Sequence, residues 1–331
     1  MRAKYISLFA FGFTLAIGGC LDADEPGNLV PKTVDEDPSL PAIDLPGTKL
    51  HAEVFGSETA PVIVVLHGGP GHDYRGLLGL RNPIDGVRLE DRHRVVFFDQ
   101  RGCGLSRRHD GDEMTIEKYE EDLTAILERF SPGRPVVLLA KSWGAMYGSW
   151  YIGRHPDRIA GAVLMEPGPL TGTLFEDVKG GIQKIDLGSE WLNDFTWSQT
   201  IVSPDDHARA DYALMVGKFG DSQPGFHEAT ENREPFWRLG ALANSKLQKD
   251  SMKNGKPDWD FTIGLSSFQR PALFIASERN EVIGAEFQRR QMQFYPNAEL
   301  ATVSNTGHDL VWVQPDATLR HIFSYLAKIG F

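Results

Sequence analysis

Cysteine is nearly absent from this sequence. Only Cys20 and Cys103 occur among its 331 residues. If Cys20 is modified, no disulfide can form, and the folded part must be stable without one. Its stability must then come from a buried core, for which a hydrophobic content of 41% is ordinary.

The sequence also lacks the charge and histidine patterns of several function classes. The formal net charge is -11 and no cluster rich in Lys and Arg stands out, which argues against a nucleic-acid surface. The ten histidines show neither H-x-x-x-H nor H-E-x-x-H spacing, so the sequence predicts no metal site. The glycine-rich stretch at residues 67–71 lacks both G-x-G-x-x-G and the P-loop Lys of phosphate sites.

The N-terminal apolar run is too short to span a membrane comfortably. Arg2 and Lys4 precede an apolar stretch from Tyr5 to Ile17, and "IGGC" closes the segment. A basic start, a short apolar core and small residues indicate an export signal over residues 1–19. "IGGC" resembles the lipobox of bacterial lipoproteins, which implies that Cys20 is diacylated and becomes the mature N-terminus. The alternative is a plain secretory signal with a chance cysteine.

Residues 20–47 are predicted to be a tether. They are rich in Pro, Asp and Glu and show no apolar periodicity. Such a composition is typical of a flexible segment that holds a domain away from a surface. We therefore expect an exported, lipid-anchored protein of the bacterial cell envelope, on the periplasmic or outer-surface side, whose membrane contact is the acylated Cys20.

From residue 48 onward, buried strands alternate with loops and helices. Apolar runs end in Gly/Pro turns at "PVIVVLHGGPG", "HRVVFFDQRGCGLS" and "RIAGAVLMEPGP", and a helical pattern follows Thr115, its expected N-cap. Repeated strand–helix units predict a mostly parallel sheet with helices on both faces, formed by residues 48–168 and 266–331. Between them, residues 169–265 show no buried strand, which predicts a mainly helical lid. Ligands of such sheets bind beyond the carboxyl ends of the strands.

"AKSWG" at residues 140–144 carries the main chemical signal. The strand "PVVLLA" runs into a helix through one tight turn at Ser142, with Ala140 and Gly144 two residues to either side. This is a variant of the G-x-S-x-G nucleophile elbow, with Ala in place of the first Gly. The pattern predicts that Ser142 is a nucleophile, and the alternative is a structural serine.

A serine nucleophile needs a base and an oxyanion hole. His308, in "SNTGHDLVW", follows the last predicted strand, where the order Ser–acid–His puts the base. "HGGPG" at residues 67–71 follows a strand and lacks side chains that would block close backbone approach. We expect the hole to consist of the N–H of Trp143 and an N–H from Gly68 or Gly69.

Together these motifs resemble the α/β-hydrolase superfamily, and within it the proline iminopeptidase group. "HGGPG" and "DQRGCGLS" are similar to that group's two early motifs, and "KSWGAMYGSWYIGRHPDRI" is similar to its elbow and helix, although the group usually has Gly-Gly-Ser-Trp-Gly. The resemblance covers about Leu50 to the C-terminus and is weakest in the lid. It implies a serine hydrolase that forms an acyl-enzyme without a cofactor. Its substrates would be short peptides or amino-acid amides with a free N-terminus.

The acid that orients His308 departs from the family pattern. Most members carry it in a G-x-x-D pattern after the strand that corresponds to "RPALFIA", where this chain has Asn280. We expect Glu166 to replace it, because some α/β-hydrolases, including certain haloalkane dehalogenases, take their acid from that earlier strand end. A Glu that closes a buried apolar strand is costly unless it is paired. Glu281 and Glu278 are the alternatives.

The lid stretch "ENREPFWR" contains the remaining candidates. In proline iminopeptidases, lid carboxylates bind the substrate's α-amine and an aromatic wall holds the proline ring. The resemblance implies these roles for Glu231, Glu234 and Trp237, against the alternative of solvated lid charges. A carboxylic ester hydrolase is the second hypothesis, because the same machinery cleaves esters. A non-catalytic binding protein on a hydrolase scaffold is the third, motivated by the missing G-x-x-D acid.

Overall fold

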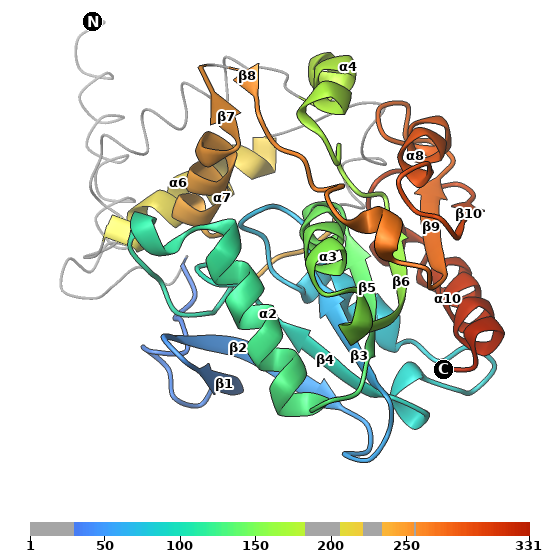
Figure 1. Ribbon diagram of the computed structural model, residues 1–331. Helices are drawn as coiled ribbons and strands as arrows, with labels where there is room; N and C mark the ends of the chain where they lie inside the picture. The colour runs from blue at the N-terminus through green and yellow to red at the C-terminus, as the bar shows by residue number, and fades with distance from the viewer. Residues whose placement is uncertain (1–29, 183–205, 221–233, 255) are drawn as a thin grey trace, which may run out of the picture.

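An eight-stranded sheet forms the centre of the computed structural model, which describes residues 30–182, 206–220, 234–254 and 256–331 (Figure 1). The strand order is β1-β2-β4-β3-β5-β6-β9-β10. β1 (Ala42–Leu45) and β2 (Thr48–Phe55) pair antiparallel, β2 is antiparallel to β4, and the other six strands run parallel. The predicted mostly parallel sheet is therefore confirmed.

The six parallel strands are apolar along most of their length, as expected for a sheet covered on both faces. Every residue of β3, β5 and β9 is buried. The strands are β3 (Val62–Leu66), β4 (Arg94–Phe98), β5 (Val136–Lys141), β6 (Ile159–Met165), β9 (Ala272–Ser277) and β10 (Ala298–Val303).

Helices cover both faces of this sheet. One core cluster joins the sheet to α2 (Ile116–Phe130) and α3 (Trp143–Arg154). The other joins its opposite face to η1 (Arg75–Arg81), α9 (Leu310–Val313) and α10 (Pro315–Ile329), while α8 (Ala285–Met292) lies beside β9 and β10. Thr115 caps α2 as predicted, because its hydroxyl oxygen accepts the Lys118 N–H at 3.3 Å.

The described part of the lid is mainly helical. It comprises α4 (Gly172–Ile182), α6 (Asp206–Gly220), α7 (Ala241–Asp250), the short hairpin of β7 (Met252–Lys253) and β8 (Lys256–Pro257), and η6 (Leu265–Ser267). Figure 1 shows α4, α6, α7 and the hairpin gathered above the sheet. The start of α7 contacts the loop at residues 67–71, where Gly240 N–H donates to Gly71 O and the Asn244 amide donates to Pro70 O, both at 2.7 Å.

The tether predicted over residues 20–47 is wrong for its second part. Val34 is buried and donates its N–H to Leu105 O at 2.8 Å, and β1 joins the sheet. The charged composition concealed this packing because the charges are paired, as Asp35 is with Arg107. The predicted signal at residues 1–19 and Cys20 lie outside the described residues.

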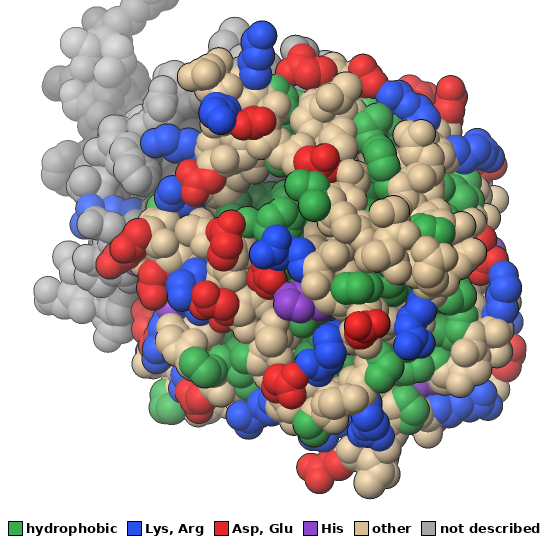
Figure 2. All heavy atoms as spheres, viewed as in Figure 1, with side chains coloured by type: hydrophobic (Ala, Val, Ile, Leu, Met, Phe, Trp, Pro, Cys, Tyr) green, Lys and Arg blue, Asp and Glu red, His purple; other side chains and the backbone are tan. Residues whose placement is uncertain are grey.

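The surface mixes charges of both signs. Figure 2 shows acidic and basic side chains interspersed over the face in view, without a continuous basic patch. Among the helices that the structure describes, none is long and apolar enough to cross a membrane.

Candidate active site

Ser142 occupies a strained turn between β5 and α3. Its backbone has φ 54° and ψ -119°, a conformation that non-glycine residues rarely adopt. The Ser142 N–H donates to Met165 O at 2.9 Å, and its carbonyl accepts the first helical N–H, from Ala145, at 3.0 Å. A turn held in this way presents the serine side chain at the end of the strand, as a nucleophile elbow requires.

The small residues around Ser142 have a steric reason. A Cβ on Gly144 would lie 2.4 Å from Leu66 O and 2.5 Å from His67 O, which is closer than real Cβ contacts. Ala140 is fully buried within β5. The helix therefore lies directly against the end of β3, and only glycine permits that approach at position 144.

Glu166 is the carboxylate that the structure brings to His308. Its Oε2 lies 2.8 Å from His308 Nδ1 and accepts the Asn280 side-chain amide at 2.8 Å. Its Oε1 accepts the Ser277 N–H at 2.7 Å and also the Ser277 hydroxyl. The side chain of Glu166 is 0% exposed. These contacts supply the hydrogen bonds that a buried carboxylate needs.

Strand order explains why these groups meet. β5 and β6 are parallel neighbours, with Lys141 opposite Met165, so Ser142 and Glu166 follow directly at the same edge of the sheet. β9 lies on the other side of β6 and ends with Ser277. His308 comes from the loop after β10, the next strand along.

The two alternative acids lie elsewhere. Glu278 and Glu281 are exposed, and the Glu278 carboxylate accepts the Asn305 N–H at 2.9 Å. Asn280 is buried, and its side-chain oxygen Oδ1 accepts the N–H groups of Val282 and Ile283 at 3.0 Å each. The usual acid position thus holds a residue that donates to Glu166.

The HGGPG loop (residues 67–71) is tied to the elbow by Gln100, which the sequence did not single out. Its backbone N–H donates to His67 Nε2, and its side-chain amide donates to His67 O, both at 2.9 Å. Its side-chain oxygen accepts the Trp143 indole N–H at 3.2 Å. His67 Nδ1 therefore carries the ring proton and donates to Gly68 O at 2.8 Å, while burial lowers the pKa of His67 and keeps it neutral.

Gly68, one of the residues predicted to form the oxyanion hole, lies beside Ser142. A Cβ on Gly68 would be 3.2 Å from the Ser142 Cβ and 3.7 Å from its Oγ, so this stretch of loop passes the nucleophile closely. Trp143 is the first residue of α3, and N–H groups in a first helical turn have no partner within the helix. Gly69 follows with φ 123°, which glycine adopts without strain.

Lys141 places a buried positive charge next to Ser142, and the sequence gave no reason to assign it a role. This buried residue precedes Ser142, and its ammonium forms an ion pair with the Glu234 carboxylate of the lid. Its Nζ also lies 3.6 Å from the Oδ1 of Asp309, the residue after His308. Burial lowers the pKa of Lys141. The carboxylate implied to bind a substrate amine is thus already paired with an ammonium of the protein.

Of the other two residues implied to bind the substrate, only Trp237 lies within the described residues. Trp237 packs edge-on against Tyr74 and His51, with ring centroids 5.0 and 5.3 Å away, and its backbone N–H donates to Asp73 Oδ2 at 2.6 Å. Glu231 lies outside the described residues. Trp237 is therefore part of the packing between the lid and the core.

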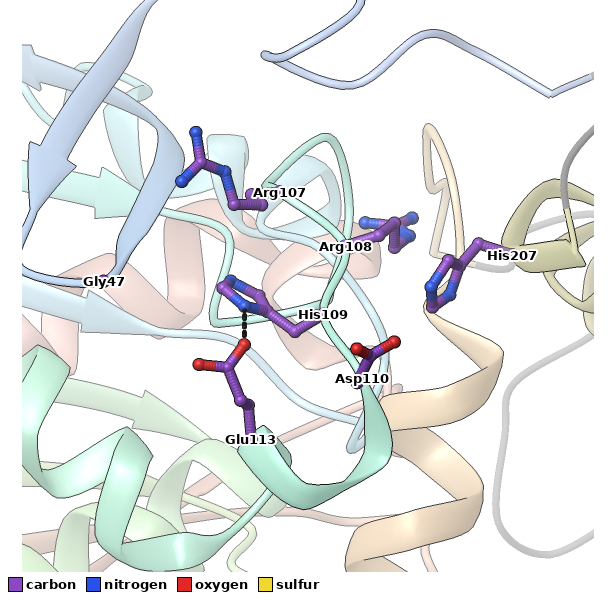
Figure 3. Close-up of a pocket in the computed structure, with 7 residues that line it drawn as sticks. All are labelled: Gly47, Arg107, Arg108, His109, Asp110, Glu113 and His207. Carbon is purple, nitrogen blue, oxygen red and sulfur yellow. Dashed lines mark hydrogen bonds and ion pairs between the residues drawn. The ribbon is translucent and has the colours of Figure 1, made fainter.

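A polar cavity of about 340 Å³ shares no lining residue with these groups; Figure 3 shows its lining, which consists of Gly47, Arg107, Arg108, His109, Asp110, Glu113 and His207. Two arginines and one histidine of this lining pair within the protein, in the contacts Arg107–Asp35, Arg108–Asp211 and His109–Glu113. These pairs join the N-terminal segment, the loop after β4 and α6, so the cavity marks a junction of segments. In the part of the chain with described coordinates, no group of three or more His, Cys, Asp or Glu could hold a metal ion.

Comparison with known proteins points to one family. The family model described as alpha/beta hydrolase fold matches residues 61–315. The chain is 32% identical over 292 residues to a cis-3-alkyl-4-alkyloxetan-2-one decarboxylase of Shewanella oneidensis, which covers 85% of this chain and 86% of that protein. It is 29% identical over 302 residues to a proline iminopeptidase of Heyndrickxia coagulans, covering 87% and 98%.

A solved structure shows the same fold. Est816, described as an enzyme that degrades N-acyl homoserine lactones, matches with a TM-score of 0.61 over 86% of this chain and 100% of its own. Its sequence identity is 18%, so the likeness concerns the fold alone.

Proposed function

The chain belongs to the alpha/beta hydrolase fold family, and from that premise we propose that it is a serine hydrolase that works through an acyl-enzyme. The pairing of His308 Nδ1 with the buried carboxylate of Glu166 carries the proposal. A carboxylate on Nδ1 orients the ring so that Nε2 serves as the base for a serine hydroxyl. Ser142 at its strained turn is the serine that this base would serve.

The reaction follows from these roles. Ser142 Oγ attacks a substrate carbonyl carbon while His308 takes the hydroxyl proton, and Glu166 stabilises the imidazolium that forms. The N–H of Trp143 and an N–H of Gly68 or Gly69 stabilise the oxyanion, and loss of one such donor costs about 100- to 1000-fold in rate. His308 then protonates the leaving group, and water releases the acyl group from Ser142 by the same route.

For the substrate class, the Lys141–Glu234 ion pair favours an ester. A lid carboxylate that binds a substrate's α-amine has to offer its charge to that amine, whereas Glu234 directs it to Lys141. By their names, the decarboxylase acts on an oxetan-2-one, which is a four-membered cyclic ester, and Est816 acts on lactones. We therefore propose carboxylic esters, cyclic esters included, as the first substrate class.

A short peptide or amino-acid amide with a free N-terminus is the second candidate. The relative named proline iminopeptidase and the motifs "HGGPG" and "DQRGCGLS" favour it. On this hypothesis Glu231, Glu234 and Trp237 would bind the substrate.

The first experiment is covalent labelling with a fluorophosphonate probe, together with hydrolysis assays. We expect the purified protein to be labelled, and Ser142→Ala to abolish both labelling and turnover of a short p-nitrophenyl ester. A prolyl arylamide and its N-blocked form test the second candidate, because only an aminopeptidase would cleave the first and spare the second. Absence of labelling in the folded protein would support a non-catalytic binding protein.

We also propose that Cys20 anchors the protein to a membrane. Arg2, Lys4 and "IGGC" support this proposal, because they match a lipoprotein signal. In a bacterial host, the full chain should fractionate with membranes and Cys20→Ser with the soluble fraction. Equal distribution of both proteins would contradict the anchor.

A further inference from the structure

Lys141, Glu234 and Asp309 form a compact set of buried charges, which we term the Lys141 cluster. Their side chains are 4%, 11% and 4% exposed. Besides the Lys141–Glu234 ion pair, the Glu234 N–H donates to Asp309 Oδ2 at 3.4 Å. Buried charges of this kind interact more strongly than charges at the surface, because little solvent screens them.

The cluster joins the three parts that must come together for catalysis. Lys141 ends β5 and precedes Ser142, Asp309 follows His308, and Glu234 belongs to the lid. The charge of Glu166, His308's partner, also acts on Lys141. The charges of the cluster and of the Glu166–His308 pair are therefore close enough to influence one another.

We propose that the Lys141 cluster sets the pH range in which His308 acts as a base, with the lid contributing through Glu234. The inference rests on the proposed function, and it treats Lys141 and Glu234 as positioning residues that act through His308. Its basis is the contact geometry of the cluster together with its burial.

Other charged groups near His308 are few in the described loops. After β9, Ser277 and Asn280 contact Glu166 and are uncharged, whereas the neighbouring Glu278 and Arg279 are exposed and bind Asn305. After β3 and β4, the buried titratable groups include neutral His67, Asp73, Asp99 and Arg101, and the Arg101 guanidinium is paired with Asp122 of α2. Lys141 is the cation that the structure places against the Glu234 and Asp309 carboxylates at this end of β5.

Removing charges of opposite sign from the Lys141 cluster distinguishes an electrostatic role from a merely structural one. Lys141→Met removes a positive charge and leaves Glu234 and Asp309 unbalanced, which stabilises imidazolium and raises the pKa of His308. Glu234→Gln removes a negative charge, which lowers the pKa of His308. Both variants break the same ion pair, so a purely structural role predicts the same change in both.

The experiment measures kcat/KM against pH for a short acyl ester. We expect the acid limb to move upward in Lys141→Met and downward in Glu234→Gln, each by about 0.5 to 1 pH unit, which is a three- to tenfold rate change on that limb. The double variant should fall between them. Lys246→Met, which removes an exposed ion pair with Asp250 on α7, is the control and should leave the limb unchanged.

Shifts in the same direction, or unchanged limbs in active variants, would overturn the inference while leaving the serine hydrolase intact. If Lys141→Met fails to fold, Glu234→Gln and Lys141→Arg still test the inference. Glu234→Gln must move the acid limb to lower pH, and Lys141→Arg must leave it at the wild-type pH. A wild-type protein without Ser142-dependent labelling would instead overturn the proposed function itself.

Discussion

At the scale of the residue, Glu166 shows how burial and hydrogen bonding together shape a site. The side chain is fully buried at the end of β6, where an unpaired carboxylate would be unstable. Ser277, Asn280 and His308 surround its two oxygens with donors. The same contacts fix its orientation, as the proposed role in stabilising charge on His308 requires.

Glu166→Gln should lower kcat by about 10³- to 10⁴-fold, because an amide cannot stabilise the imidazolium and favours the wrong ring tautomer. The measurement is kcat on a short acyl ester, with circular dichroism to show that the variant is folded. Glu281→Gln, at an exposed site, is the matched control and should retain full activity. The assignment of the acid is wrong if the two variants exchange these outcomes.

Asn280→Asp should weaken the enzyme without abolishing it. The new carboxyl group would lie about where the amide now donates to Glu166 at 2.8 Å, and two carboxylates that close share a proton. We expect kcat to fall by about tenfold at neutral pH and to recover at higher pH as the shared proton leaves. A pH profile identical to that of the wild type would contradict this reading of the contact.

At the scale of the element, the close approach of α3 to β3 determines the position of Ser142. Gly144 meets the carbonyl oxygens of Leu66 and His67, whereas Gly148, one turn further along, faces ordinary side-chain contacts at 3.4 Å or more. The two glycines lie on one helix and differ only in what a methyl group would touch.

Gly144→Ala should destabilise the protein by about 1 to 3 kcal/mol or more, because the methyl group would force α3 away from β3. Gly148→Ala should be neutral or stabilising by up to about 1 kcal/mol, since alanine favours helix. Urea unfolding of both variants checks this, and equal midpoints would refute the steric argument. Only Gly144→Ala should also lose activity, because it displaces Ser142.

Elements of this kind were predictable from sequence because their signals are local. The runs around Ala140, the cap at Thr115 and the turn at Ser142 each lie within a few residues, and the structure has the strands and helices that they predicted. The Lys141–Glu234 pair was not predictable, since 93 residues separate its members and neither motif indicates what the other residue contacts. Gln100 lies in the quoted motif "DQRGCGLS", but its contacts with His67 and Trp143 span more than 30 residues and leave no local signal.

At the scale of the whole molecule, buried polar contacts fasten the lid and the N-terminal segment to the core. Asp211 of α6 is 1% exposed and pairs with Arg108 from the core and Arg238 from the lid. Arg238 in turn donates to Pro31 O at 2.8 Å. Composition alone assigned residues 20–47 to a tether, because the distant partners of a charged stretch, such as those of residues 30–47, cannot be seen in the sequence.

Asp73 makes stability depend on pH at this same junction. Its carboxyl group accepts the N–H groups of Trp237 and Arg238, and burial together with the nearby Asp99 raises its pKa to about 8 from an ordinary 3.8. Between these values the folded protein binds more protons at this group than the unfolded chain does. The contribution of Asp73 to the free energy of unfolding is therefore present at low pH and is lost as pH rises toward 8.

Asp73→Asn should remove that dependence, because an amide of the same shape does not titrate. We expect the decrease in Tm from about pH 5 to pH 8.5 to be smaller in the variant than in the wild type. Thermal unfolding followed by circular dichroism at several pH values provides the measurement. Parallel curves would show that Asp73 does not titrate in this range.

The contact between Asn280 and Glu166 also bears on descent. The position that holds the acid in most members of the family and the position proposed here touch through a single hydrogen bond. A lineage could therefore transfer the acid from one strand end to the other in two substitutions, through an intermediate that carries both carboxylates and still turns over substrate. Relocation of a catalytic group then requires no inactive ancestor.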